Sequence, residues 1–344
     1  MAADFGYSRF SRLRRRNVLS FAPCKTLIFF DAMSLFALIA ALLLEQLHPL
    51  SSRKYLRGWL SGYVLFFQHH FNAGQRKHGK IAWLLAVLPL LAGTVALSWL
   101  LYYTHPVFLF VFNVLVLYLT MGFRQFSHYF TDIHQALRDD KLEEARTLLT
   151  EWRGIPALEL NAQEVARITI EEALVASHRN VFGVILWFVL FSAVGLGGAA
   201  GALLYRLGQS LRSRWGDEEQ SELGEFGGFA RQAFHVLEWL PLRMTAATFA
   251  VVGDFEDTVY CWRTQAASWP DRETGILLAS GAGALGVRLG MPIPQDGLLL
   301  DRPELGVGDD ADVDFMRSTI GLVWRSVVFW LILLLLLTLA SLLG

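Results

Sequence analysis

The 344-residue sequence contains only two cysteines, Cys24 and Cys261, and neither stands in a CxxC or histidine-rich pattern. A disulfide framework and a zinc site are therefore not expected. Charge is scarce as well, since charged residues make up 18% of the chain and the formal net charge is −1. Without an excess of positive charge the chain has no electrostatic field for nucleic acid, so nucleic acid is not expected as a partner.

Several catalytic motifs are also missing. The sequence has no Ser-His-Asp nucleophile motif, no phosphate-binding loop and no zinc-ligand spacing. His69 and His70 are adjacent and point to different sides of a helix, and among His128, Asp132 and His134 only the first two share a face. We therefore predict no metal site and no cofactor from these residues.

Apolar residues, in contrast, are abundant. They make up 54% of the chain and gather in long runs, with a mean hydropathy of +0.39. A helix needs roughly 20 apolar residues to cross the hydrocarbon core of a bilayer. Four runs approach this length and a shorter fifth ends near Glu45: Ile81–Tyr103, Pro106–Phe123, Val181–Tyr205, Val327–Leu343 and Ser34–Leu47. We predict an all-α, polytopic membrane helical bundle with four or five spans.

Two further apolar segments are interrupted. Val236–Gly253 contains Pro241 and Arg243, and Gly275–Gly290 contains several glycines. Irregular backbone at membrane depth is tolerated only inside protein or beside a wet cavity, so both are expected to be broken or re-entrant interior helices. The polar segment 124–180 predicts two or three amphipathic helices outside the hydrocarbon, and Ile293–Asp314, rich in Gly, Pro and Asp, predicts irregular surface.

The basic residues raise a question about the N-terminus. Basic loops prefer the cytoplasmic side. The basic segments 9–16 and 53–80 would both lie there, although only one candidate span separates them. The conflict disappears if translation begins at Met33. We therefore expect residues 1–32 to be a disordered or mis-started extension, and residues 33–344 to form a single membrane domain.

Some ionisable residues stand next to, or inside, these apolar runs. Glu171, Val175 and Arg179 are four residues apart and share one helix face, and His235 and Glu238 are neighbours at i, i+3. Ionisable groups at membrane depth are costly and usually functional, which favours a polar pocket over ion pairs that only join two helices. For Arg288, flanked by glycines, an anion site and a packing role both stay open.

Five stretches together resemble the CobD/CbiB (adenosylcobinamide-phosphate synthase) superfamily. They lie at residues 118–149, 165–188, 202–216, 226–246 and 281–290, and the last contains the most specific match, GALGVRLG. The resemblance covers nearly all of Met33–Gly344. It implies an integral membrane protein that, in the cobalamin branch, joins an aminopropanol unit to a corrinoid carboxylate.

The resemblance also shows where acids are missing. Glu171 is retained, but the acids of the superfamily pattern are replaced by Val175, Arg179, Arg212, Phe234 and His235. Carboxylates suit Mg²⁺, whereas guanidinium groups repel it. The resemblance therefore implies that metal-assisted chemistry has been lost. The segments EEALVASHRNVFGVILWF and HVLEWLPLR are similar to the AmpE branch, whose members are regarded as membrane modulators.

Two hypotheses follow. The first is an AmpE-like, non-synthase sensor or signalling modulator of the bacterial inner membrane, which contacts the lipid bilayer and binds a small molecule or a membrane-protein partner. Its polar pocket would consist of Glu171, Arg179, Arg212, His235, Glu238, Arg243 and Arg288. The alternative is a diverged synthase that forms an amide between cobyric acid and aminopropanol in an ATP-linked reaction. There Mg²⁺ would be held by Glu171, Glu238, Asp217 or Asp271. A transporter has less support, because no inverted repeat is visible.

Overall fold

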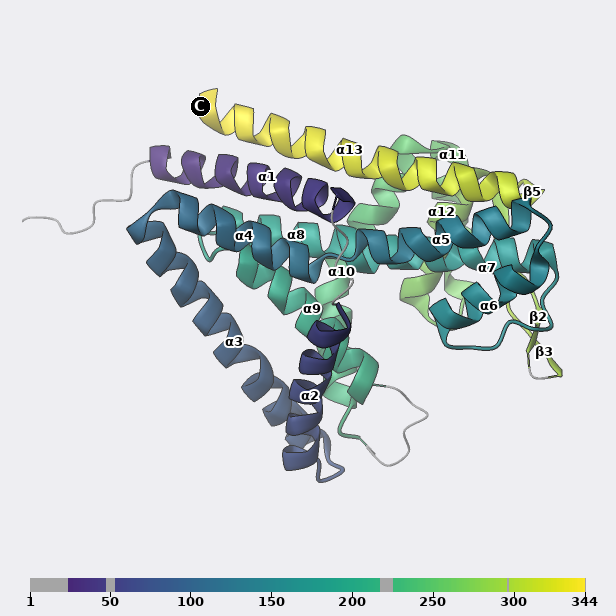
Figure 1. Cartoon of the computed structure of the whole chain (residues 1–344), viewed down its shortest axis with the longest axis horizontal. Coiled ribbons are helices and arrows are strands. Elements are labelled where there is room, and N and C mark those ends of the chain that lie inside the picture. The colour runs from purple at the N-terminus through teal and green to yellow at the C-terminus, as the bar shows by residue number, and fades with distance from the viewer. Residues whose placement is uncertain (1–23, 48–52, 217–224, 296, 344) are drawn as a thin grey trace, which may run out of the picture.

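The computed structural model describes residues 24–47, 53–216, 225–295 and 297–343, and helices dominate it (Figure 1), which confirms the all-α class. In chain order the helices are α1 (Cys24–Leu47), α2 (Arg53–Phe71), α3 (Arg76–Thr104), α4 (Pro106–Thr120), α5 (Phe123–Arg138), α6 (Leu142–Arg153), α7 (Ala162–Ser177), η1 (His178–Phe182), α8 (Gly183–Ala193), α9 (Gly198–Trp215), α10 (Gly228–Val252), α11 (Phe255–Thr264), η3 (Ala266–Ser268), α12 (Arg272–Leu285) and α13 (Val313–Leu343). Of the segment expected to be an extension, the part from Cys24 onward is helical, and residues 1–23 lie outside the described residues.

The longest helix combines a polar and an apolar half. It runs without a break from Ala162 to Ala193 through α7, the π-helical turn η1 and α8. Asn161 caps its start: the side chain accepts from the Glu164 N–H, and Glu164 bonds back to the Asn161 N–H. A π-helical turn inside an α-helix re-aims the side chains around it and is frequent at functional sites.

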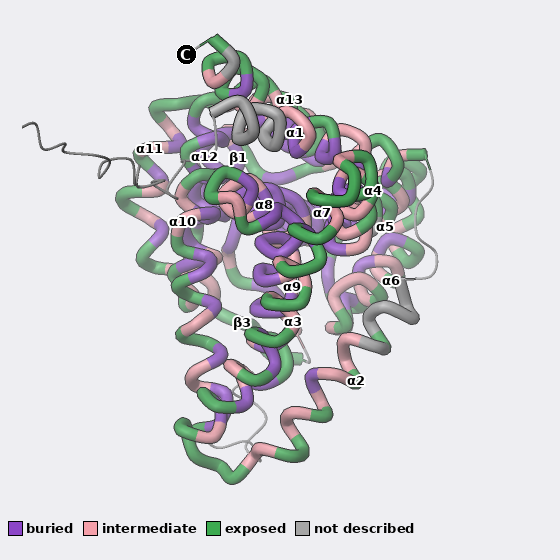
Figure 2. Tube along the Cα trace, turned by 90° about the vertical axis from the view of Figure 1, so that its left-hand side faces the viewer, coloured by how far each residue is buried: buried purple, intermediate pink, exposed green. Residues whose placement is uncertain are grey.

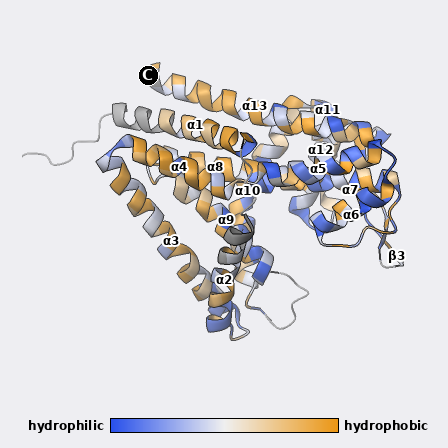
Figure 3. Ribbon diagram, in the orientation of Figure 1, coloured by the Kyte–Doolittle hydropathy of each residue, from blue (hydrophilic) through white to orange (hydrophobic). Residues whose placement is uncertain are grey.

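Three helices in the described part of the chain are long and apolar enough to cross a membrane: Arg76–Thr104, Ala162–Ala193 and Val313–Ser341. Two shorter apolar helices accompany them, Ala32–Leu47 and Pro106–Thr120. Figure 3 shows apolar residues along α3, α4, α8 and α13, while α5, α6 and α7 are more polar. The protein is a helical membrane protein, with fewer long spans than the four or five predicted.

The difference comes from the predicted spans Ser34–Leu47 and Pro106–Phe123, which form only the two shorter helices. The apolar run Val181–Tyr205 departs from the prediction in another way. It was expected to form one span, but α8 ends at Ala193 and the chain turns before α9 begins at Gly198. Gly195 and Gly197 both adopt positive φ in this turn, a conformation that glycine adopts without strain. The run is therefore a helical hairpin, and its first half belongs to the helix that begins at Ala162.

Helix α10 was expected to be broken at Pro241, yet it is continuous from Gly228 to Val252. A proline inside a helix has no N–H for the carbonyl four residues earlier. Here that carbonyl belongs to Leu237, and the Trp187 indole N–H of α8 donates to it at 3.0 Å. A neighbouring helix thus satisfies the group that the proline leaves unpaired.

The segment expected to be irregular surface contains short strands. Helix α12 ends at Gly286, which has a φ of 65°, and is followed by β1 (Val287–Gly290), β2 (Ile293–Gln295), β3 (Leu298–Leu300), β4 (Glu304–Leu305) and β5 (Asp309–Asp310). Strand β1 lies between β4, antiparallel, and β5, parallel, while β2 and β3 form a hairpin. GALGVRLG is thus a helix end followed by a strand: the interior helix predicted over Gly275–Gly290 is present as far as Leu285, and its last residues form β1 instead.

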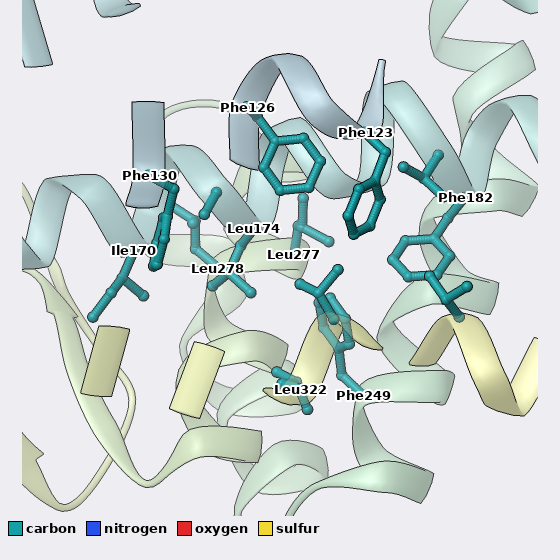
Figure 4. Packing of buried hydrophobic residues seen from close by; sticks show 14 of the residues in the cluster. Phe123, Phe126, Phe130, Ile170, Leu174, Phe182, Phe249, Leu277, Leu278 and Leu322 are labelled. Atoms are coloured by element: carbon teal, nitrogen blue, oxygen red, sulfur yellow. The ribbon is translucent and has the colours of Figure 1, made fainter. Parts of the chain in front are cut away.

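The core lies between the polar and apolar halves of the molecule. Buried residues follow α8 and α9 through the middle of the view in Figure 2. In Figure 4, side chains of α5, α7, α10, α12 and α13 pack together, among them Phe126, Leu174, Leu277, Phe249 and Leu322. This packing fixes the positions of the helices from which the charged side chains project. The helices predicted over 124–180 are confirmed, and the last of them continues into the apolar α8.

Candidate functional site

Charged side chains from four helical elements meet next to the π-helical turn. Glu238 of α10 is 1% exposed and Glu273, in the first turn of α12, is 7% exposed. His178 and Arg179 come from η1, and Arg212 comes from the last turn of α9. Buried carboxylates are rare unless paired, so this cluster is the strongest candidate for a functional site among the described residues.

Basic groups face both oxygens of the Glu238 carboxylate. Oε1 lies 3.5 Å from His178 Nε2 and 3.7 Å from Arg179 Nε, and Oε2 lies 3.4 Å from Arg212 Nη1. The distances are longer than those of a tight bidentate pair. Glu238 therefore has three basic partners, and none of them makes a short hydrogen bond with its carboxylate.

The second carboxyl group of the site belongs to Glu273. It shares a hydrogen bond with Glu238 and contacts His235 Nδ1. Arg212 lies 3.8 Å from Glu273 Oε2 and 3.8 Å from Asp271 Oδ2. Arg212 therefore links all three acids of the cluster, while His235, with 61% of its side chain exposed, connects Glu273 to solvent.

A contact with Thr245 fixes the orientation of the His178 ring. The Thr245 hydroxyl donates to the Pro241 carbonyl at 3.0 Å, so its oxygen is left to accept from His178 Nδ1, also 3.0 Å away. If Nδ1 carries the proton of a neutral imidazole, Nε2 is an acceptor that faces a carboxylate. This nitrogen lies 3.5 Å from Glu238 Oε1, so the His178 ring connects Thr245 to the buried carboxylate.

The two carboxyl groups hold their protons very differently. Burial opposes ionisation of Glu238, but the hydrogen bond from His178 and the charge of Arg179 outweigh it and lower the pKa of Glu238 to about 2. Burial, followed by the charge of Glu238 and the hydrogen bond to it, raises the pKa of Glu273 to about 8. At neutral pH the pair therefore shares one proton, as interacting carboxyl groups do.

A divalent cation does not fit this arrangement. The oxygens of Glu238 that would ligate Mg²⁺ already face His178, Arg179 and Arg212. Among the residues that the structure describes, no three His, Cys, Asp or Glu side chains are grouped so that they could hold a metal ion. Guanidinium groups stay charged and would repel a divalent ion, so we derive no step through a metal.

Glu171 lies elsewhere on the same helix. Its carboxylate receives two hydrogen bonds from Arg302, at 2.8 and 3.1 Å, and one from the Gly290 N–H at 2.8 Å. Eight residues separate it from Arg179, which corresponds to about 12 Å along a helix. Glu171 thus joins α7 to the strand segment, and the seven residues expected to form one pocket do not converge.

Two other candidate residues also lie outside the cluster core. Arg288 Nη2 is 2.6 Å from Asp310 and its Nη1 is 3.7 Å from Glu304, so it bridges strands at the surface of the small sheet. Arg243 lies over the Trp239 ring at 4.3 Å and donates to the Trp239 carbonyl at 2.9 Å. The structure thus brings together Arg179, Arg212, His235 and Glu238. Asp217 falls outside the described residues.

The seven residues predicted for the pocket leave out two members of the cluster, Glu273 and His178. Glu273 follows Asp271, whose side chain caps α12 by accepting from the Thr274 N–H, so an acid at this place is also typical of an ordinary helix start. His178 stands beside Arg179 and gave no spacing signal of its own. Helical periodicity relates residues within one helix, whereas these two depend on contacts between helices.

These features define a helical membrane protein with a buried charge cluster between its helices. The family described as "CobD/Cbib protein" matches residues 34–323, and the chain belongs to this family. It is similar to the cobalamin biosynthesis protein CobD of Stutzerimonas stutzeri, with 35% identity over 88% of this chain and 98% of that protein. For the CobD protein of Chromobacterium violaceum the identity is 34%, over 72% of each chain.

More distant relatives agree with this assignment. The cobalamin biosynthesis protein CbiB of Salmonella arizonae is 25% identical over 77% of this chain and 85% of its own length. No solved structure matches the chain. The relatives support the CobD/CbiB family, and a closer similarity to the AmpE branch stays a prediction.

Proposed function

We propose that the protein is an amide-forming enzyme of cobalamin biosynthesis, which joins a primary amine to a corrinoid carboxylate. This is the second of the two hypotheses from the sequence. It is supported by relatives named for cobalamin biosynthesis, one of them 35% identical over nearly its whole length. The single observation that carries the chemistry is the buried pair Glu238 and Glu273, which shares one proton beside two arginines.

Amide formation needs a proton acceptor. A primary amine is mostly protonated at neutral pH, and it becomes a nucleophile only after losing a proton. Its nitrogen then bonds to the activated carbonyl carbon, the activating group leaves with the bonding electrons, and a second proton leaves the nitrogen. A group with a pKa near the working pH is best suited to accept such protons, and Glu273, with a pKa of about 8, has this property.

The arginines supply the second requirement, which is binding of negative charge. Negative charge develops on the carbonyl oxygen during attack, and preorganised donors that face it lower the barrier. Arg179 and Arg212 are partly exposed beside the acid pair. Glu273 would accept the proton while the arginines bind the oxyanion. The ATP-linked activation that the resemblance implies belongs to the same proposal.

The surroundings of the enzyme form part of the proposal. Helices long enough to cross a bilayer support a multi-pass protein of the bacterial inner membrane, surrounded by lipid and binding a small molecule at the charge cluster. The non-synthase modulator is the second candidate. It is favoured by the resemblance, which implies that Arg179 and Arg212 stand where the superfamily pattern has acids.

Complementation tests the proposal. A strain that lacks its corrinoid amide synthase receives the wild-type gene, Glu273→Gln, or the control Glu304→Gln, which changes an exposed glutamate beside Arg288. We expect growth without added cobinamide from the wild type and the control, and none from Glu273→Gln at equal membrane abundance. If wild-type protein inserts normally but does not restore growth, the synthase proposal fails and the modulator is favoured.

A further inference from the structure

We propose that Arg179 and Arg212 form a binding site for a phosphate or carboxylate group that works without a divalent cation. The identity of the natural ligand rests on the proposed function, but anion binding itself is measured without turnover. The two guanidinium groups come from η1 and α9 and flank the same carboxylate, that of Glu238. Arg179 faces one oxygen of this carboxylate and Arg212 faces the other, so both guanidinium groups lie next to the buried acid pair.

Most of the hydrogen-bonding capacity of these arginines is unused. A guanidinium carries five N–H donors. Within the described part of the chain, Arg179 makes no hydrogen bond and only a 3.7 Å ion pair, and Arg212 makes one hydrogen bond, at 3.4 Å. Arg302, in contrast, donates to Met291, Gly290 and both oxygens of Glu171. Arg302 is a completed structural anchor, whereas Arg179 and Arg212 keep donors for a ligand.

The two side chains are also accessible, although their positions are fixed. They are 31% and 28% exposed, against 11% for Arg302. Phe234 lies against the Arg212 guanidinium, 5.4 Å from ring centre to guanidinium carbon, and Glu238 anchors both arginines from the buried side. An anion can therefore reach donors whose orientation is already set, which lowers the entropic cost of binding.

One buried polar atom at the same place lacks a partner. The Tyr205 hydroxyl makes no hydrogen bond within the described residues, and this side chain is fully buried. The charges of Glu238 and Arg179 both act on the pKa of Tyr205, so its hydroxyl lies near these two side chains. Buried polar groups are nearly always hydrogen-bonded. A ligand oxygen beside the arginines would give this hydroxyl an acceptor.

The local charge favours an anion and disfavours a metal. Glu273 holds a proton at neutral pH, so its carboxyl group is uncharged there. Arg179 and Arg212 then lie on the two oxygens of a single ionised and buried acid, Glu238. Two positive charges beside one buried negative charge attract an oxyanion and disfavour a divalent cation.

Binding of inorganic pyrophosphate provides the test. Full-length protein in phosphatidylcholine nanodiscs is titrated with pyrophosphate in EDTA by calorimetry, as wild type, Arg179→Gln, Arg212→Gln and Arg212→Lys. The control is Arg288→Gln, which removes an arginine of the small sheet. We expect binding in EDTA that falls about tenfold or more for each Gln variant, because a charge-assisted hydrogen bond is lost, and less for the Lys variant.

Each outcome decides the proposal. Unchanged binding for Arg288→Gln, together with loss for the cluster variants, supports it. Competition by phosphatidylglycerol in the nanodisc also supports it and identifies a lipid headgroup as the source of the phosphate. Binding that requires Mg²⁺, or that falls equally for Arg288→Gln, overturns it. A protein that binds pyrophosphate but does not restore growth would contradict the proposed function alone.

Discussion

Arg302 is largely buried and Arg288 is exposed, so their ion pairs are expected to contribute differently to the free energy of unfolding. Arg302 and Glu171 are both largely buried and meet through two short hydrogen bonds. Removing one partner of such a pair leaves an uncompensated buried charge. We therefore expect Arg302→Met to lower the free energy of unfolding by about 3–5 kcal/mol. Arg288→Met, at an exposed pair, should cost about 1 kcal/mol or less.

Denaturant unfolding of the two variants in matched micelles measures the difference. Equal losses for Arg302→Met and Arg288→Met would contradict the structural role of the Glu171 pair. The double variant Arg302→Met with Glu171→Leu should regain part of the stability, because no buried charge is then left alone.

The acid pair predicts a pH dependence of the reaction rate. If Glu273 accepts the proton, kcat/KM rises with pH and levels off above about pH 8, the pKa of this group. In Glu238→Gln the midpoint should move to lower pH, since the negative charge that raises the pKa of Glu273 is gone while the effect of burial persists. A pH–rate profile with the same midpoint in both proteins would show that a different group accepts the proton.

At the scale of elements, close helix crossings depend on glycine. A Cβ at Gly201 of α9 would lie 2.0 Å from the Trp187 carbonyl oxygen of α8, so Gly201→Ala forces the two helices apart. We expect a loss of roughly 1–3 kcal/mol, as for other overpacked sites. Gly93→Ala on α3 is the control, because a Cβ at Gly93 would meet no atom within 4 Å and alanine favours the helix by about 0.5–1 kcal/mol.

Thermal unfolding in the same detergent separates the two glycine variants. A Gly201→Ala protein as stable as wild type would mean that α8 and α9 are not in this close contact.

The sequence predicted which residues are neighbours within one helix, but it did not predict which residues meet between different helices. Helical spacing correctly put His235 and Glu238 on neighbouring positions, and apolar length predicted most of α3 and α13. Glu273, 35 residues beyond Glu238, could not be assigned to the site because helix α12 must fold back on α10 first. Pro241 indicated a break, but a tryptophan from another helix supplies the missing donor, which periodicity does not reveal.

The same limit applies to the apolar run over 181–205. Glycine is tolerated within membrane helices as well as in turns, so Gly195 and Gly197 did not show that the chain reverses there. The strands over 287–310 are only two to four residues long and their pairing is set by contacts with distant residues, which explains why composition alone predicted irregular surface.

At the scale of the whole molecule, exposed apolar side chains indicate where lipid lies. Leu88 of α3 and Leu336 of α13 are more than half exposed, and so is Leu158 in the polar part between α6 and α7. Thiols react as thiolates, which form in water and not in hydrocarbon. In a Cys24→Ser, Cys261→Ser background, Leu158→Cys should react with a water-soluble maleimide, while Leu88→Cys and Leu336→Cys should not.

Labelling is measured in native membranes and again after denaturation in detergent. All three cysteines should react once the protein is unfolded. Rapid labelling of Leu88→Cys or Leu336→Cys in intact membranes would contradict the assignment of α3 and α13 as lipid-facing helices.

The most direct test of the proposed chemistry is amide formation by the purified protein in nanodiscs, measured as corrinoid product per protein molecule with an ATP-dependent activation system present. Wild type and Glu304→Gln should form the amide, and Glu273→Gln and Arg212→Gln should form at least about a hundredfold less, as for the loss of a general base or an oxyanion donor. Product formation by Glu273→Gln at the wild-type rate would show that the buried acid pair is not the site of the reaction.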